Sequence, residues 1–141
     1  MRCHLVELEL AGSAGTDIHD VTAAVAEAVA ASGVTQGLVT VHVPGSTGAV
    51  TTIEYESGAL ADLRDCLERL APADGHYAHN LRWHDGNGYS HLRAALLGPS
   101  LSLPVVEGRP LLGTWQQVVV LDFDNKPRRR RVIVQVLGDP S

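Results

Sequence analysis

The sequence predicts an α+β domain with a largely antiparallel β-sheet and two main helices. Three observations support this: strand-like alternation at the N-terminus, two segments with helical spacing of apolar residues, and a C-terminal half of short apolar runs. The expected order is strand, helix, two strands, helix, loop and then about four strands, which favours an antiparallel arrangement. With 141 residues and no linker-like stretch, residues 1–141 are expected to form a single domain.

The N-terminal segment predicts a strand, a helix and a second strand. Residues Arg2 to Leu10 alternate between apolar and polar side chains, as a half-buried strand does. Asp17 is expected to cap a helix that runs to about Ser32, with Gly33 just past its end. Residues Gln36 to Val43 place valines at alternate positions and predict the next strand.

A glycine-rich turn and a second helix follow. Residues Pro44 to Gly48 predict a loop rich in backbone donors, and residues Ala49 to Tyr55 predict a third strand. Leucines spaced for one face of a helix predict a second helix over Ser57 to Leu70. Pro72 ends this helix, because the residue before a proline disfavours the helical conformation.

The C-terminal half is interpreted as strands. Arg93 to Leu97 and Ser100 to Val106 are short apolar runs, and Thr114 to Phe123 is a longer one. The turn signal Asp124-Asn125-Lys126-Pro127 predicts that Arg129 to Leu137 returns as the hairpin partner of the long run.

The composition narrows the classes of function. A formal charge of −5 disfavours a general nucleic-acid-binding role, which is typical of basic domains. No apolar run of about 18 residues could span a membrane, and the first residues lack a secretory pattern, so a cytoplasmic location is expected. The two cysteines form neither a disulfide framework nor a CxxC metal motif.

Histidines are concentrated in one stretch. Four of the seven fall between His76 and His91, where few aliphatic residues occur and a loop is expected. Neutral imidazole is the commonest metal ligand and exchanges protons near neutral pH. No familiar spacing such as HExxH is present, so the ligands would have to converge through folding, and a surface loop with hydrogen-bonded histidines is the alternative. The candidate ligands are His79, His84, His91 and Asp85, with Glu54 from the third strand. The sequence does not choose the divalent metal, with zinc, iron, manganese, nickel and magnesium all open.

Two further segments could bind an anion. Gly45-Ser46-Thr47-Gly48 could do so through backbone N–H groups and hydroxyls, although a plain glycine-rich loop is the commoner case. Arg128 to Arg131 begin a strand, so alternate arginines face opposite sides. We interpret Arg129 and Arg131 as charges that protect a strand edge, and phosphate capture remains open for Arg128 and Arg130.

Trp115 and Gln116 begin the long apolar run. A lone tryptophan there is typical of a core or a subunit interface. Gln116 could orient a nearby polar group.

Several phrases, taken in order, resemble the YjbQ-like family of uncharacterised proteins. They are Ser46-Thr47-Gly48-Ala49 with Glu54, Tyr77-Ala78-His79-Asn80, Ser90-His91 running into Arg93-Ala94-Ala95-Leu96-Leu97-Gly98-Pro99-Ser100, Gly113-Thr114-Trp115-Gln116, and Pro127-Arg128 with Arg130. An ordered set that covers most of the chain is far more specific than any one of these phrases.

The resemblance implies a compact α+β homotrimer with its site near subunit boundaries. In some members it also implies a secondary thiamine-phosphate synthase activity, which joins a hydroxymethylpyrimidine diphosphate to a thiazole phosphate and releases pyrophosphate. The expected catalytic residues are Glu54, His79, His91 and Gln116. The expected substrate-binding residues are Ser46, Thr47, Trp115, Arg128 and Arg130, and the expected metal ligands are His79, His84 and His91.

One position departs from the family pattern. Many members have a histidine just before the Ser/Thr-Thr pair, and here Gly45 takes that position. His84 is the candidate substitute, because it lies with Asp85 in the histidine-rich stretch.

Three hypotheses follow. The first is an enzyme that acts on phosphorylated small molecules, with histidines that bind a divalent metal or move protons and with arginines that bind phosphate. The second is a non-catalytic metal- or anion-binding homotrimer with a structural or regulatory role. In the third, no metal binds and the histidines form a hydrogen-bonded interface network.

Overall fold

The computed structural model describes all 141 residues, and every paired strand is antiparallel. The α+β prediction is therefore confirmed, with two sheets in place of one. The elements in chain order are β1 (Arg2–Gly12), β2 (Asp17–Asp20), α1 (Thr22–Ser32), β3 (Gln36–His42), β4 (Gly48–Ile53), α2 (Ser57–Leu70), α3 (Ala78–Trp83), α4 (Gly88–Leu97), β5 (Ser100–Val106), β6 (Arg109–Pro110), β7 (Gln117–Asp122) and β8 (Arg128–Asp139).

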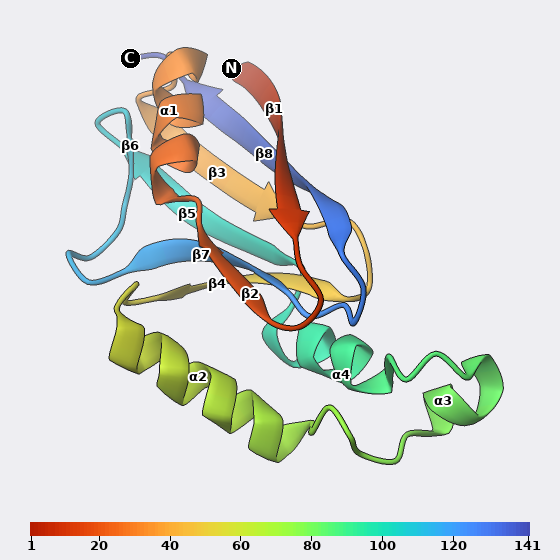
Figure 1. The fold of residues 1–141 in the computed structure, drawn as a ribbon. Helices are drawn as coiled ribbons and strands as arrows, with labels where there is room; N and C mark the ends of the chain where they lie inside the picture. Colours follow the sequence, from red (N-terminus) through yellow and green to blue (C-terminus); the bar gives the residue numbers. More distant parts are fainter.

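The two sheets are stacked, and α2 and α4 cover the face of the smaller sheet that points away from the larger one (Figure 1). The larger sheet has the strand order β1-β8-β3-β5-β6, and the smaller has the order β2-β7-β4 (Figure 1). Helix α2 lies along the smaller sheet on the side away from the larger one, and α3 stands apart from both sheets beyond α4 (Figure 1). None of the helices combines the length and the apolar character that crossing a membrane requires.

Strand β7 separates two apolar cores. Successive side chains of a strand point to opposite faces, so Val118 and Val120 enter a valine-rich core between the sheets, closed on one side by α1. Val119 and Leu121 face the other way and pack with buried residues of α2 and α4. The smaller sheet, which contains β7, is therefore buried on both faces. This explains why the sequence of β7 is a continuous apolar run.

The predicted start of the first helix is wrong. Asp17 does not cap a helix, because residues Asp17–Asp20 form β2 and pair with β7. The side chain of Asp17 accepts a hydrogen bond from the Ser13 amide at 2.6 Å, within the turn that follows β1. Asp20 instead accepts one from the Thr22 amide at 3.0 Å, and α1 begins there. Burial of Ile18 against the second core outweighs the local capping signal.

The expected hairpin is also wrong. Strand β8 pairs with β1 and β3, while β7 pairs with β2 and β4. The turn at 124–127 therefore carries the chain from the smaller sheet to the larger one. Both edges of β7 are already occupied, and β8 instead contributes Val132, Val134 and Val136 to the core between the sheets.

The histidine-rich stretch is not a loop, and the run Arg93 to Leu97 is not a strand. They form α3 and α4, joined by a short connection. The inward-facing positions of α4 are Ser90, Arg93, Ala94 and Leu97, which have helical spacing. Two of these four, Ser90 and Arg93, are polar and are buried because they form hydrogen bonds. The sequence therefore lacks the apolar spacing that would have predicted this helix.

Candidate functional site

A buried ion pair closes one end of the core between the two sheets. Asp122 follows Val118 and Val120 on the inward face of β7, and Arg130 precedes Val132 on the inward face of β8. Arg130 Nη2 lies 2.9 Å from Asp122 Oδ1, and the two side chains are only 7% and 0% exposed. Charged groups are rarely buried this fully unless they are paired, and the pairing explains how both charges can be buried here.

One carboxylate oxygen of Asp124 accepts three hydrogen bonds. Oδ2 accepts from Arg128 Nε at 2.6 Å, from Thr47 Oγ1 at 3.0 Å and from Asn87 Nδ2 at 3.3 Å. Burial alone would raise the pKa of Asp124, but these bonds and the Lys126 amide favour the charged form and lower its pKa below the ordinary value. Asp124 is therefore an ionised carboxylate inside the protein.

Thr47 joins the two ion pairs into one network. Its hydroxyl donates to Asp124 and accepts a hydrogen bond from Arg130 Nη2. Three of the expected substrate-binding residues, Thr47, Arg128 and Arg130, are thus brought together by folding. The neighbouring arginines face the opposite side: Arg131 pairs with Glu7, and Arg129 Nη1 lies 3.4 Å from Glu9.

A cavity of about 250 Å³ lies directly over this network. A Cβ atom added to Gly45 would lie 3.1 Å from Arg130 Nη1, and one added to Gly48 would lie 3.4 Å from Arg130 Cζ. The backbone of these two glycines therefore lies between the guanidinium of Arg130 and the cavity, with no side chain added to it. The residues that line the cavity are Gly45, Ser46, Gly48, His91, Ala94, Ala95 and Pro99.

The structure brings two of the expected histidines together. The rings of His79 on α3 and His91 on α4 are tilted, with centroids 4.4 Å apart. His79 Nδ1 lies 3.4 Å from Asp85 Oδ1, and the Gly88 amide donates to Asn80 Oδ1 at 3.0 Å, which ties α3 to the start of α4. The histidine nearest the cavity is His91, which lines it.

His84 stands outside this arrangement. It is exposed, ends α3 in the left-handed conformation (φ 53°) and does not line the cavity beside Gly45. No three His, Cys, Asp or Glu side chains of the chain are grouped as a metal ion requires. A metal on His79 and His91 would therefore need further ligands from outside the chain, such as substrate oxygens or a second subunit.

Helix α4 is anchored to the buried network by its first turn. Ser90 Oγ donates to the Phe123 carbonyl at 2.6 Å and also contacts Asn87 Oδ1. Further along the helix, Arg93 donates to the Ala71 carbonyl at 3.0 Å and pairs with Glu68. These contacts hold His91 in place beside the cavity.

The remaining expected site residues lie at the other end of the smaller sheet. Gly48 is opposite Asp122 in the β4–β7 pairing, and Ile53 is opposite Gln117. Five strand positions separate these pairs, or about 17 Å at roughly 3.3 Å per residue. Gln116 Nε2 donates to Thr52 Oγ1 at 3.3 Å, and Trp115 is 73% exposed, so it is not a core residue. Within one chain, Glu54, Trp115 and Gln116 are far from the histidines.

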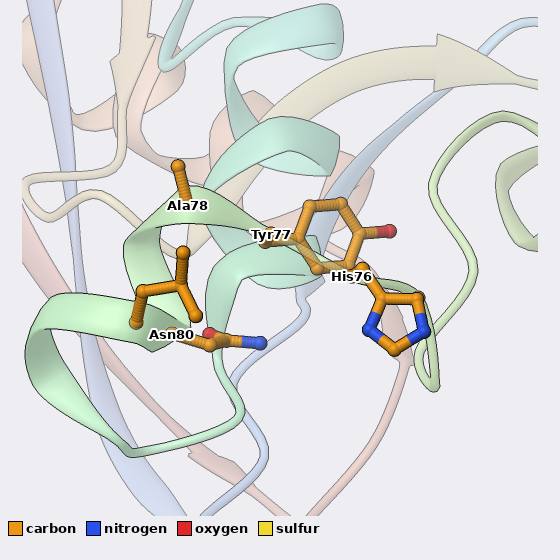
Figure 2. A pocket seen from close by; sticks show the side chains of 6 residues that line it. His76, Tyr77, Ala78 and Asn80 are labelled. Carbon is orange, nitrogen blue, oxygen red and sulfur yellow. The ribbon is translucent and has the colours of Figure 1, made fainter.

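A separate cavity of about 300 Å³ lies where the chain enters α3 (Figure 2). His76 and Tyr77 extend from the segment that leads into the helix, and Asn80 follows within it (Figure 2). The Tyr77 hydroxyl donates to the Pro72 carbonyl at 2.6 Å. No charged network adjoins this cavity, whereas Gly45 and Gly48 of the smaller cavity lie against the guanidinium of Arg130, and we therefore place the candidate site there.

The sequence analysis missed four residues of the network: Asp122, Asp124, Asn87 and Ser90. Asp122-Phe123-Asp124 ends an apolar run, and Arg128 and Arg130 begin the next strand with the same alternate spacing. Two acids and two arginines on matching inward positions were a signal for paired buried charges, but the segment was interpreted only as a turn.

Comparison with known proteins identifies the family. A model of the family described as "UPF0047 protein YjbQ-like" matches residues 6–139. The chain belongs to this YjbQ-like family. A UPF0047 protein of Methanothermobacter thermautotrophicus is 39% identical over 99% of this chain and 96% of its own length, and one of Archaeoglobus fulgidus is 40% identical over 94% of this chain and its entire length.

Solved structures of YjbQ-like proteins share the fold. A YjbQ-like protein of unknown function from Sulfolobus solfataricus superposes with a TM-score of 0.87 at 28% identity, covering 97% of this chain and 99% of its own. A protein of the same family from Clostridium acetobutylicum superposes with a TM-score of 0.86 at 32% identity, covering 94% and 99%. The architecture described above is therefore that of the family.

Proposed function

We propose that this YjbQ-like protein binds a phosphorylated small molecule in the cavity over Arg130 and acts on it chemically. The observation that supports this most directly is the buried guanidinium of Arg130 behind Gly45 and Gly48, next to a cavity lined by Ser46 and His91. A guanidinium offers several donors in a plane, which suits phosphate oxygens. Because Arg130 itself is buried, its charge is screened less by water than that of a surface arginine.

The chemistry that the family resemblance implies fits these groups. In a thiamine-phosphate-synthase-type transfer, a diphosphate leaves the pyrimidine methylene carbon as the thiazole nitrogen attacks it. The negative charge that develops on the diphosphate must be neutralised, which Arg128, Arg130 and the Ser46-Thr47 loop could do. His79 and His91 would move protons or hold a metal beside the leaving group.

A homotrimer would complete the site. Glu54 and Gln116, which we propose as catalytic residues, and Trp115 lie too far from His91 to act in the same subunit. Both ends expose large apolar side chains: Trp115 is 73% exposed at one end and Leu81 of α3 is 80% exposed at the other. If one end of each subunit contacts the opposite end of the next, the head-to-tail interface can close into a ring of three, with a shared site at each boundary.

A divalent metal, zinc or magnesium, fits this proposal only if the protein leaves some of its coordination positions open to other ligands. His79 and His91 would hold it, and Asp85 would orient His79 through Nδ1. His84, our proposed third ligand, would have to come from a neighbouring subunit or move toward the pair. When bound, the metal would supply positive charge to the diphosphate.

The alternative is a cytoplasmic, non-catalytic anion- or metal-binding trimer. The observation that favours it is the charge balance of the network, since Asp122 and Asp124 each pair with one arginine. Pairs whose charges neutralise each other in this way can be structural. Turnover, rather than binding alone, therefore distinguishes the two functions.

Two adjacent arginines allow a direct test of anion binding. Arg128 pairs with Asp124, whereas Arg129 faces the opposite side and is 82% exposed. We expect Arg128→Gln to weaken binding of inorganic pyrophosphate about tenfold, the loss of one charge-assisted hydrogen bond, and Arg129→Gln to leave it unchanged. Isothermal titration calorimetry measures both. Equal affinities of the two variants would contradict the proposed site.

Catalysis is tested on metal-defined protein with the pyrimidine diphosphate and thiazole phosphate as substrates. Formation of thiamine phosphate and release of pyrophosphate, both lost in His91→Gln, would support the enzyme. Pyrophosphate binding without turnover of any phosphorylated thiamine precursor would instead support the non-catalytic alternative.

A further inference from the structure

We propose that Asp124 is a positioning residue that orients three elements of the network beneath the cavity relative to one another. The three donors on its Oδ2 atom come from three different elements. Thr47 belongs to the loop before β4, Asn87 is the residue that caps α4, and Arg128 begins β8. What the oriented groups bind rests on the function proposed above, but the orientation itself can be tested separately.

The carboxylate sets the direction of the hydrogen bonds that Thr47 and Asn87 make. An ionised carboxylate only accepts, so the Thr47 hydroxyl must give its proton to Asp124 and keep its lone pairs for Arg130 Nη2. In the same way, Asn87 must turn its Nδ2 toward Asp124, and its Oδ1 then faces the hydroxyl of Ser90. Ser90 is followed by His91, so the order set at Asp124 reaches the histidine that lines the cavity.

Arg128 is the group that most needs such support. Its side chain is 53% exposed, and an unpaired arginine at the surface samples many rotamers. The Asp124 contact is made through Nε, at 2.6 Å. Because Nε is used, Nη1 and Nη2 are left as the donors available to a ligand.

Asp124 itself is held rigidly. The Lys126 amide donates to its Oδ1 atom at 3.0 Å, and the Asp124 amide donates to Asp122 Oδ1 at 3.0 Å. The backbone thus links the two acids, and each acid pairs with one arginine. A carboxylate that is fixed at both oxygens and at its own amide is suited to place other groups.

The test uses Asp124→Asn in the full chain, with Glu7→Gln as a matched control. Glu7 also pairs with an arginine of β8, Arg131, but this pair lies on the face of the strand opposite to Arg128 and Arg130. We expect Asp124→Asn to weaken pyrophosphate binding by about tenfold or more, because the charge-assisted bonds that orient the donors are lost. We expect the control to change it less than about twofold, with both titrations made where the variants are folded.

Nuclear magnetic resonance provides a readout that does not need a ligand. In the native protein the Arg128 Nε–H should give a hydrogen-bonded, slowly exchanging signal, and it should be lost in Asp124→Asn but kept in Glu7→Gln. If the native protein binds no pyrophosphate, the proposed function fails, and the Arg128 signal still decides whether Asp124 positions this group. An unchanged Arg128 signal in the folded variant would overturn the positioning role.

Asp124→Glu covers the case in which the asparagine variant does not fold. It keeps the negative charge but moves the carboxylate outward by one methylene group. A positioning residue predicts a several-fold weaker pyrophosphate affinity and a shifted Arg128 Nε–H signal. Native affinity and a native signal in this variant would show that only the charge matters, which would also overturn the proposal.

Discussion

The Asp122–Arg130 pair offers the sharpest test of how this fold is built. Leucine has nearly the shape of aspartate and methionine can fill the space of the arginine stem, so Asp122→Leu and Arg130→Met each remove one charge and retain volume. Both charges are buried, at 0% and 7% exposure, and each single change leaves the other without its partner. Breaking such a pair costs about 3–5 kcal/mol. This is a large part of the roughly 5–15 kcal/mol that stabilises a typical domain.

The double variant should behave differently. The pair is imperfectly satisfied in the native fold, because Asp122 Oδ2 and Arg130 Nε are buried without hydrogen-bond partners. Replacing both charges removes this desolvation penalty, so we expect the double variant to lie within about 2 kcal/mol of the native protein. Its loss should be far smaller than the two single losses combined. It should nevertheless fail to bind pyrophosphate, because Arg130 is gone.

Urea unfolding followed by circular dichroism measures all four proteins of this cycle at neutral pH and low temperature. Unchanged m-values would show that the same surface is exposed in each case. The reasoning is refuted if Asp122→Leu costs less than about 1 kcal/mol, or if the two single losses simply add in the double variant.

Three further predictions concern pH, assembly and metal. The lowered pKa of Asp124 contributes stability above the ordinary value of 3.8 that disappears as pH falls through the lower folded value. The difference in unfolding free energy between the native protein and Asp124→Asn should therefore be constant near neutral pH and shrink below about pH 4, and a difference that grows in acid would contradict this. Trp115→Asp should shift sedimentation from the proposed trimer to monomer with little change in melting temperature, whereas Leu5→Asp, at an exposed apolar residue on the outer face of β1, serves as comparison. A trimeric Trp115→Asp would remove this residue from the interface. His79→Ala combined with His91→Ala should lower bound metal, measured by elemental analysis, without unfolding the protein, and metal retained at native stoichiometry would exclude these two ligands.

Local periodicity was reliable where one face of an element is apolar. The leucines of α2 predicted its bounds, Ser57–Leu70, and the alternation at the N-terminus predicted most of β1. The same approach failed for α4, because Ser90 and Arg93 are buried through hydrogen bonds rather than through hydrophobicity. Family resemblance selected Thr47, His79, His91, Arg128 and Arg130 as candidate site residues, but it did not reveal which of them lie together.

Asp122 and Asp124 show why the site could not be predicted from the sequence alone. Asp122 ends the smaller sheet and Asp124 follows it by two residues, while Arg128 and Arg130 belong to the larger sheet, and no spacing in the chain shows that these sheets are stacked. Once they are stacked, alternate inward positions of β7 and β8 must meet, and buried charges there must pair.

The chain thus encodes locally its α+β character, the bounds of several elements and the residue types of the proposed phosphate-binding site. The pairing of β8 with β1 and β3 and the separation of Trp115 from His91 depend on contacts between residues far apart in the sequence. Such contacts follow from burying both faces of β7 at once, and this requirement involves the whole domain rather than any single segment.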